Sequence, residues 1–83
     1  MSEEKFSALL GVAIIPQVVA IIAREENLSD VAAVSVFYQS ETFALLEKEE
    51  TKVWHYSPLS LYQIWKTEQE TGKIELPEEG LLI

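Results

Sequence analysis

Residues 6–23 read FSALLGVAIIPQVVAIIA, and these 18 consecutive positions contain no ionisable side chain. A run of this length is typical of a membrane-spanning helix, which needs about 20 apolar residues. Pro16 and Gln17 argue against a span, because they place a missing N–H and a polar amide in its middle. The flanks are mainly acidic, with Lys5 and Arg24 among four glutamates, and no Trp, Tyr or cluster of basic residues anchors either end. We therefore expect a buried helix of a cytoplasmic protein, with a membrane-associated helix over 6–23 as an alternative.

Pro16 also raises the question of where the helix begins. A proline is tolerated in the first turn of a helix, whereas in the interior it produces a kink. In both cases Val12, Ile15 and Val19 lie away from the apolar stripe that would face the core, so the segment is apolar on both sides. A chain of 83 residues has little remaining mass to cover a second apolar side. We expect a second copy to cover it, in a homodimer or larger oligomer with Val12, Ile15 and Val19 at the interface.

Two serines predict the starts of the next helices. Asn27 is a plausible stop for the first helix, and Ser29 is a good N-cap for a second. The run VAAVSVFY that follows is rich in β-branched residues, so a strand competes with a helix there. Helical spacing would bury Val31 and Val34 together with Phe37 or Tyr38. Ser40 predicts the start of a third helix, with Phe43 and Leu46 on its buried side.

The clearest helix signal is Ser57-Pro58, which combines an N-cap with a proline at the first helical position. Leu61, Ile64 and Trp65 form one side of the helix that follows, and Gly72 ends it. Residues 51–56 (TKVWHY) favour extended backbone, as a short strand or an ordered loop. The predicted fold is mostly α, a small bundle of three to four helices. Residues 53–56 and 74–76 could in addition pair as two short strands. We expect one helical domain over 1–76 and a C-terminal tail over 77–83.

Composition excludes several classes of function. The chain has 14 acidic and 6 basic residues, a formal charge of −8, one histidine and no cysteine. Without cysteine there is no disulfide framework, no thiolate metal site and no cysteine nucleophile. The basic residues are scattered among acidic ones, which argues against nucleic-acid binding. The three glycines lie far apart, so no phosphate-binding loop is present. We expect no catalytic residues, no metal and no cofactor.

His55 offers the one alternative of a chemical site. It lies close to Ser57 in the sequence, and Tyr38 could add a further hydroxyl to a pocket. A nucleophilic serine also needs an orienting acid and an oxyanion hole, and no motif indicates either. A small enzyme or ligand-binding protein built around Tyr38, His55 and Ser57 is therefore the second hypothesis. It requires that these three side chains converge in a concave pocket.

Trp54, His55 and Tyr56 form the densest aromatic group in the chain. If this stretch is extended, its side chains alternate, so one set faces outward. An exposed aromatic group on an acidic protein is a reasonable docking surface for a basic protein partner. With Val12, Ile15 and Val19, these three residues complete the candidate interaction surface. The leading hypothesis is a non-enzymatic protein–protein interaction module.

Residues 16–70 carry a set of motifs that resembles short bacterial helical proteins with no assigned activity. The motifs are Asn27-Leu28-Ser29, Phe37-Tyr38-x-Ser40-x-Thr42-Phe43-x-Leu45-Leu46 and Glu50-Thr51-x-x-Trp54-x-x-Ser57-Pro58-x-x-Leu61-Tyr62. The resemblance implies a small cytoplasmic, mostly helical protein and supplies no catalytic residue. Some short bacterial domains of this general kind are encoded beside toxins, so an antitoxin-like role follows by analogy alone.

Overall fold

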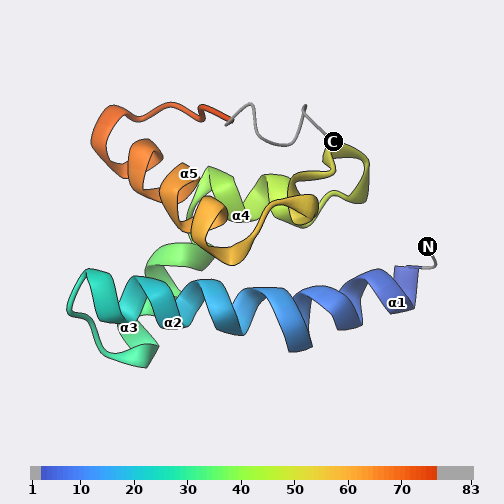
Figure 1. Cartoon of the computed structure of the whole chain (residues 1–83), viewed down its shortest axis with the longest axis horizontal. Helices are drawn as coiled ribbons and strands as arrows, with labels where there is room; N and C mark the ends of the chain where they lie inside the picture. The colour runs from blue at the N-terminus through green and yellow to red at the C-terminus, as the bar shows by residue number, and fades with distance from the viewer. Residues whose placement is uncertain (1–2, 77–83) are drawn as a thin grey trace.

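The computed structural model describes residues 3–76 and arranges them as helices in two layers (Figure 1). The long N-terminal helix forms one layer and α4, α5 and the short turns between them form the other, while α3 passes behind α2 and leads up to α4. The elements in chain order are α1 (Glu3–Ala8), η1 (Leu9–Ile14), α2 (Ile15–Glu25), α3 (Asp30–Tyr38), α4 (Glu41–Leu46), η2 (Glu49–Thr51), η3 (Val53–His55) and α5 (Pro58–Thr71). The prediction of a small, mostly α bundle is confirmed. The predicted tail over 77–83 lies outside the described residues.

The N-terminal helix, defined here as α1, η1 and α2 together, is continuous from Glu3 to Glu25 (Figure 1). Its middle part, η1, is a π-helix, in which the Ile15 N–H donates to the Leu10 carbonyl. Pro16 lies in the first turn of α2, directly after this wider stretch. The Gln17 side chain donates a 2.6 Å hydrogen bond to the Ala13 carbonyl. Wider winding therefore lets one helix continue through a proline that an ordinary α-helix would tolerate poorly.

Local capping signals determine where the later helices begin and end. The side chains of Ser29, Ser40 and Ser57 each accept a hydrogen bond from a backbone N–H three residues on, at 3.2, 3.1 and 3.1 Å. Asn27 takes a left-handed conformation with φ 55°, and Gly72 does the same with φ 77°. The helix stops and starts predicted at these residues are confirmed, because each depends on a short-range hydrogen bond or backbone angle.

The hydrophobic core lies between the two layers. Its buried side chains are Phe6, Leu10, Val18, Val19, Ile22, Ala33, Phe37, Leu46, Val53, Leu61, Ile64 and Trp65. The predicted buried side of α5 is confirmed. For α3 the prediction is right for Phe37, which is fully buried, and wrong for Val31 and Val34, which are 81% and 39% exposed. The side of α3 that meets α2 carries Ala33 and Phe37 at i, i+4 spacing, and Val31, Val34 and Tyr38 lie on the outer side.

The strand interpretation of residues 51–56 is also wrong. Two single-turn 3₁₀-helices, η2 and η3, occupy this stretch and meet at Lys52, which has φ 59°. The Thr51 hydroxyl donates to the carbonyls of Leu45 and Lys48, at 2.7 and 2.8 Å. Such side-chain bonds to nearby carbonyls compete with extended pairing. The described residues contain no strand, so the predicted pairing of 53–56 with 74–76 is not formed.

Candidate interaction surface

A groove of about 410 Å³ runs between the N-terminal helix and α3. It is lined by Gly11, Ile15, Pro16, Val19, Ala20, Asp30, Val34 and Tyr38. Most of these side chains are aliphatic, and Asp30 is the only charged residue in the lining. The π-helical stretch and Pro16 form one wall, and π-helical segments occur frequently at functional sites.

Two strongly exposed valines adjoin the groove. Val12 is 80% exposed and lies one turn before Pro16 on the N-terminal helix. Val31 is 81% exposed and begins an outward stripe with Val34 and Tyr38, at i, i+3 and i+7 spacing. We call the eight lining residues together with Val12 and Val31 the α2–α3 face. This face has the apolar helical periodicity of a buried surface, yet Val12, Val31, Val34 and Tyr38 on it are exposed.

The three aliphatic residues expected at the interface lie at different depths. Val12 is exposed, Ile15 is half-buried in the groove wall, and Val19 is buried. Val19 therefore forms part of the floor of the groove and is already covered by its own chain. The expectation that all three require a second chain is corrected for Val19, because α3 packs against α2 from that side.

The aromatic part of the predicted surface lies elsewhere. It belongs to η3, in the layer of α4 and α5, and it packs against α1. Trp54 is half-buried, packs its ring edge-on to Phe6 at 5.7 Å and donates from Nε1 to the Glu49 carbonyl at 2.9 Å. His55 is exposed and stacks on Trp54 with ring centroids 4.0 Å apart. Tyr56 is half-buried. The two halves of the predicted surface are thus separate sites, and Trp54 is mainly a packing residue.

Tyr38, His55 and Ser57 do not converge. Tyr38 lines the groove and stacks on Phe43 at 4.4 Å. The Ser57 hydroxyl accepts from the Ser60 N–H and donates to the Ser60 hydroxyl, both at 3.1 Å, so it is engaged in capping α5. Neither His55 nor Ser57 lines the groove. The geometry that the enzyme hypothesis requires is not formed by these residues.

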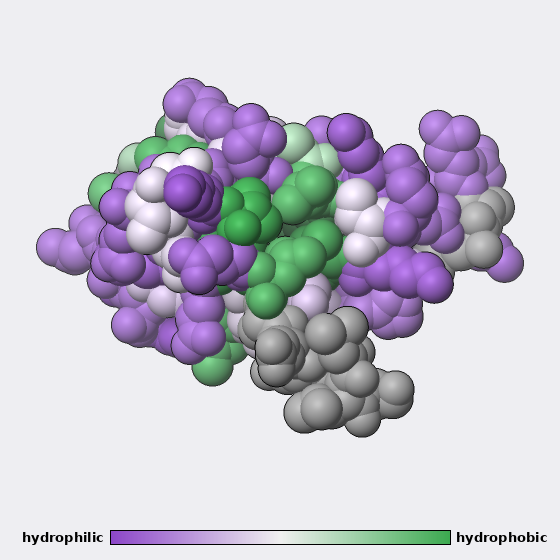
Figure 2. Space-filling model, turned by 90° about the horizontal axis from the view of Figure 1, so that it is seen from above, coloured by the Kyte–Doolittle hydropathy of each residue, from purple (hydrophilic) through white to green (hydrophobic). Residues whose placement is uncertain are grey.

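The outer face of the α4–α5 layer shows apolar residues gathered at its centre within a polar surround (Figure 2). A smaller hollow of about 260 Å³ on α5 is lined by Gln63, Ile64, Thr67, Glu75 and Leu76. Three of these five residues are polar, so this hollow is less suited to an apolar ligand than the groove. Among residues 3–76, no group of three histidine or acidic residues could hold a metal ion.

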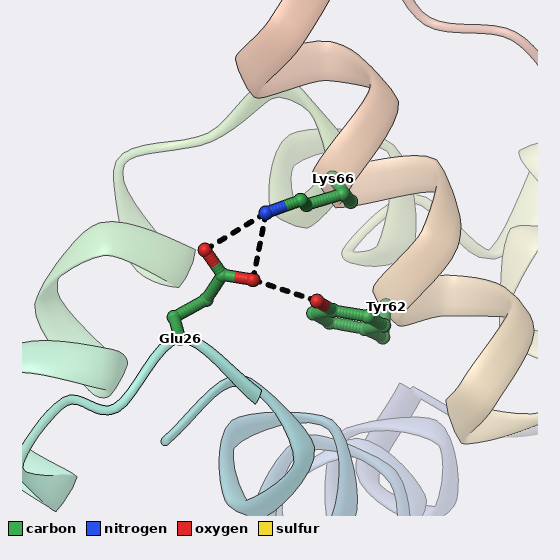
Figure 3. Close-up of polar contacts among 3 residues, drawn as sticks. All are labelled: Glu26, Tyr62 and Lys66. Carbon is green, nitrogen blue, oxygen red and sulfur yellow. Dashed lines mark hydrogen bonds and ion pairs between the residues drawn. The ribbon is translucent and has the colours of Figure 1, made fainter. Parts of the chain in front are cut away.

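A polar cluster of Glu26, Tyr62 and Lys66 joins the end of α2 to α5 (Figure 3). The Glu26 carboxylate accepts from the Tyr62 hydroxyl at 2.7 Å and from Lys66 Nζ at 2.9 and 3.0 Å. The hydrogen bonds from Tyr62 and Lys66 lower the pKa of Glu26. The bond to Glu26 and partial burial raise the pKa of Tyr62 to about 12, and the same carboxylate raises the pKa of Lys66. The cluster holds the two layers in register and offers no unpaired group for chemistry.

Glu68 makes a second contact between distant segments. Its carboxylate accepts from the N–H groups of Glu41 and Thr42, at 2.9 and 3.0 Å, and from the Thr42 hydroxyl at 2.7 Å. These bonds satisfy free donors at the start of α4 with a side chain from α5. The sequence analysis found neither Glu26 nor Glu68, because the partners lie 26–40 positions apart and no local pattern marks them.

The N-terminal helix is long and apolar enough to cross a membrane by length and composition alone. Its most apolar 18-residue window has a mean hydropathy of 2.3, and 33% of that window is buried within the fold. The remaining part is available to another apolar surface.

Comparison of the chain with known protein families, curated proteins and solved structures found no match.

Proposed function

We propose that this chain is a small, cytoplasmic, non-enzymatic interaction module that binds another polypeptide at the α2–α3 face. The observation that carries the proposal is the pair Val12 and Val31, which are 80% and 81% exposed beside an apolar groove. Full burial of a valine is worth roughly 1.5–3 kcal/mol, so two such side chains favour association appreciably. Exposed apolar stripes on packed helices are typical of protein-binding sites.

The shape of the face also supports a polypeptide partner. A groove between two helices, with apolar residues at helical spacing on both walls, is the geometry that accepts an amphipathic helix. The groove carries one acidic side chain, Asp30, and the chain as a whole has a charge of −8. These charges disfavour nucleic acid as the ligand. If the partner is a different protein, the acidic charge of this chain favours a basic one.

Membrane association is the second candidate, and the hydropathy of the N-terminal helix is the observation in its favour. Insertion would remove the core side chains Val18 and Ile22, both 0% exposed, from their contacts with α3 and α5. It would also place Glu3 and Glu25 at the ends of the span, where basic and aromatic residues are preferred. The packed helix is therefore better explained as part of a protein interface.

Quantitative affinity capture from the native cell tests this function. Val12→Glu and Val31→Glu each put a charge on the α2–α3 face, and both positions are exposed enough to keep the fold intact. Leu59→Glu is the matched control, because Leu59 is 54% exposed on α5 and does not line the groove. We expect wild type and control to capture the same stoichiometric polypeptide, either another protein or an untagged copy of this chain. Both face variants should lose it. Equal capture by all four proteins would refute the α2–α3 face as the binding site.

A further inference from the structure

We infer that the partner at the α2–α3 face is a second copy of this chain, with the two N-terminal helices crossing at Gly11 around a two-fold axis. This inference rests on the proposed function and specifies the occupant of the same face. It is carried by a glycine that the single chain does not need and by an uncharged helix segment, 6–23, on a strongly acidic protein, and the arrangement of the face fits a two-fold contact.

Gly11 lies inside the N-terminal helix, where glycine is less stable than alanine. A Cβ atom at this position would meet nothing within 4 Å, and the residue has no positive φ that would require glycine. The π-helical winding does not require it either, since the other five residues of η1 carry side chains. The missing side chain therefore has no explanation within one copy. Close approach of another helix backbone explains it, because glycine permits that approach.

The charge pattern indicates which surface two copies of this chain could share. Two copies with a charge of −8 each repel one another, and the repulsion is strongest where acidic side chains meet. Residues 6–23 form the longest segment without any ionisable side chain. Pairing through this segment keeps the acidic residues of both copies at the margins. The N-terminal helix is thus the surface on which self-association meets the least repulsion.

The α2–α3 face is also self-complementary, as a two-fold interface requires. It presents a protruding side chain, Val12, beside a groove lined by Ile15 and Val34. Rotation about an axis near Gly11 brings Val12 of each copy towards the groove of the other. Asp30, at the start of α3, then lies towards the edge of the contact.

The available area predicts a weak dimer. The N-terminal helix is about 35 Å long and α3 about 14 Å, and each presents a strip about 10 Å wide, which sets an upper limit of roughly 500 Å² per copy because crossing helices separate towards their ends. Two copies then bury no more than about 1,000 Å², at the lower limit of specific interfaces. We therefore expect a concentration-dependent equilibrium in the micromolar range.

Sedimentation equilibrium of the purified full chain, from about 1 µM to about 200 µM, tests the inference. We expect wild type and Leu59→Glu to pass from monomer to dimer with the same micromolar Kd. Gly11→Leu should raise Kd at least about tenfold, because its side chain separates the helices. Circular dichroism should show the same helix content in all three proteins, which separates lost association from lost folding.

Three outcomes would overturn the inference. A wild-type chain that stays monomeric at about 200 µM refutes self-association. A Gly11→Leu chain that dimerises as wild type does refutes the helix crossing. If the wild type is monomeric while capture in the cell still depends on Val12 and Val31, the partner is a different protein and the proposed function stands. Flotation of the wild type with phosphatidylcholine vesicles, abolished by Val12→Glu, would instead identify a lipid surface and refute both proposals.

Discussion

At the scale of single residues, Glu26 is the strongest polar contact between the layers. Its carboxylate pairs with Tyr62 and Lys66 over a sequence separation of 36 and 40 positions. Both partners belong to α5, while Glu26 directly follows α2. Without this contact, the end of α2 and the middle of α5 would be joined by apolar packing alone. The residue therefore adds a specific polar contact to the apolar packing of α5 on the N-terminal helix.

Glu26→Gln should destabilise the fold by about 1 kcal/mol at pH 7, the range of a partly exposed ion pair with added hydrogen bonds. The pKa of Glu26 is lowered in the folded state from its ordinary 4.5, so its contribution is present above that value and is lost as the pH falls below it. Urea unfolding of wild type and variant at several pH values measures this. The two curves should be separated at pH 7 and converge in acid. A constant separation down to acidic pH would contradict the account.

Tyr62 provides the complementary test at alkaline pH. Because its pKa is raised from 10.0 to about 12, its contribution is present below pH 10 and is lost as the pH rises towards 12. Tyr62→Phe keeps the ring and removes the donor. We expect the stability difference between wild type and Tyr62→Phe to disappear over that alkaline interval. Ultraviolet titration of the tyrosines in wild type should show one that ionises late, and its absence would argue against the hydrogen bond to Glu26.

At the scale of elements, α4 depends on α5 for its start. Glu68 accepts two backbone N–H bonds and the hydroxyl of Thr42, whose side chain is fully buried. Glu68→Ala should cost about 1–3 kcal/mol, because it leaves a buried hydroxyl and two helix N-terminal donors without their acceptor. Glu68→Gln, which keeps one acceptor oxygen, should lose less. Thermal unfolding ranks the three proteins. Equal stability of the alanine variant and wild type would show that solvent replaces the carboxylate.

The N-terminal helix gives the second prediction at this scale. Gly11→Ala should stabilise an isolated monomer by about 0.5–1 kcal/mol, since the helix gains a better helix former and the new methyl group meets no neighbour. Thermal unfolding at low micromolar concentration, where the monomer dominates, measures this effect. A destabilised monomer would mean that the π-helical stretch requires glycine, and the argument for a helix crossing at Gly11 would then lose its basis.

The residues at which the helices begin and end were largely predictable from the sequence. The side of each helix that faces solvent was less predictable. Ser29, Ser40, Ser57 and Gly72 act through contacts a few residues away, so the sequence identifies them. The exposure of Val31 depends on how α3 lies against α2, which no local pattern encodes. Both sides of α3 are apolar, and only the tertiary packing, which buries Ala33 and Phe37 completely, distinguishes them. Of the two alternatives for residues 51–56, the strand fails because hydrogen bonds of Thr51 and Trp54 override the β propensity of the stretch.

The candidate surface was predictable in outline only. The uncharged run indicated Val12 and Ile15, and both lie at the α2–α3 face. The second wall of the groove, formed by Val34 and Tyr38, could not be found from the sequence, because it depends on the packing of two helices. The sequence shows a glycine at position 11. That no neighbour within the chain requires it became clear only from the open space around it in the structure.

At the scale of the whole molecule, the charge of −8 opposes association while the α2–α3 face favours it. Salt screens the repulsion between two acidic copies and strengthens apolar burial, so both effects act in the same direction. We expect the dimer Kd to fall several-fold between about 50 mM and about 500 mM sodium chloride, where the Debye length shortens to a few ångström. Sedimentation equilibrium at both salt concentrations measures it. A Kd that rises with salt would indicate an interface held by ion pairs and would contradict an apolar one.

The central claim is that another copy covers the exposed side of the N-terminal helix, and cysteine cross-linking tests it most directly. The chain has no cysteine, so Gly11→Cys and Leu59→Cys each introduce a single thiol at a known place. A cysteine side chain is much smaller than leucine and weakens the contact less. If two helices cross at residue 11, the two thiols therefore still lie close enough for a disulfide, which needs Cα atoms about 4.4–6.8 Å apart. Under mild oxidation we predict a covalent dimer of Gly11→Cys that forms rapidly, and none of Leu59→Cys at the same concentration. Equal, slow cross-linking of the two variants would contradict the claim.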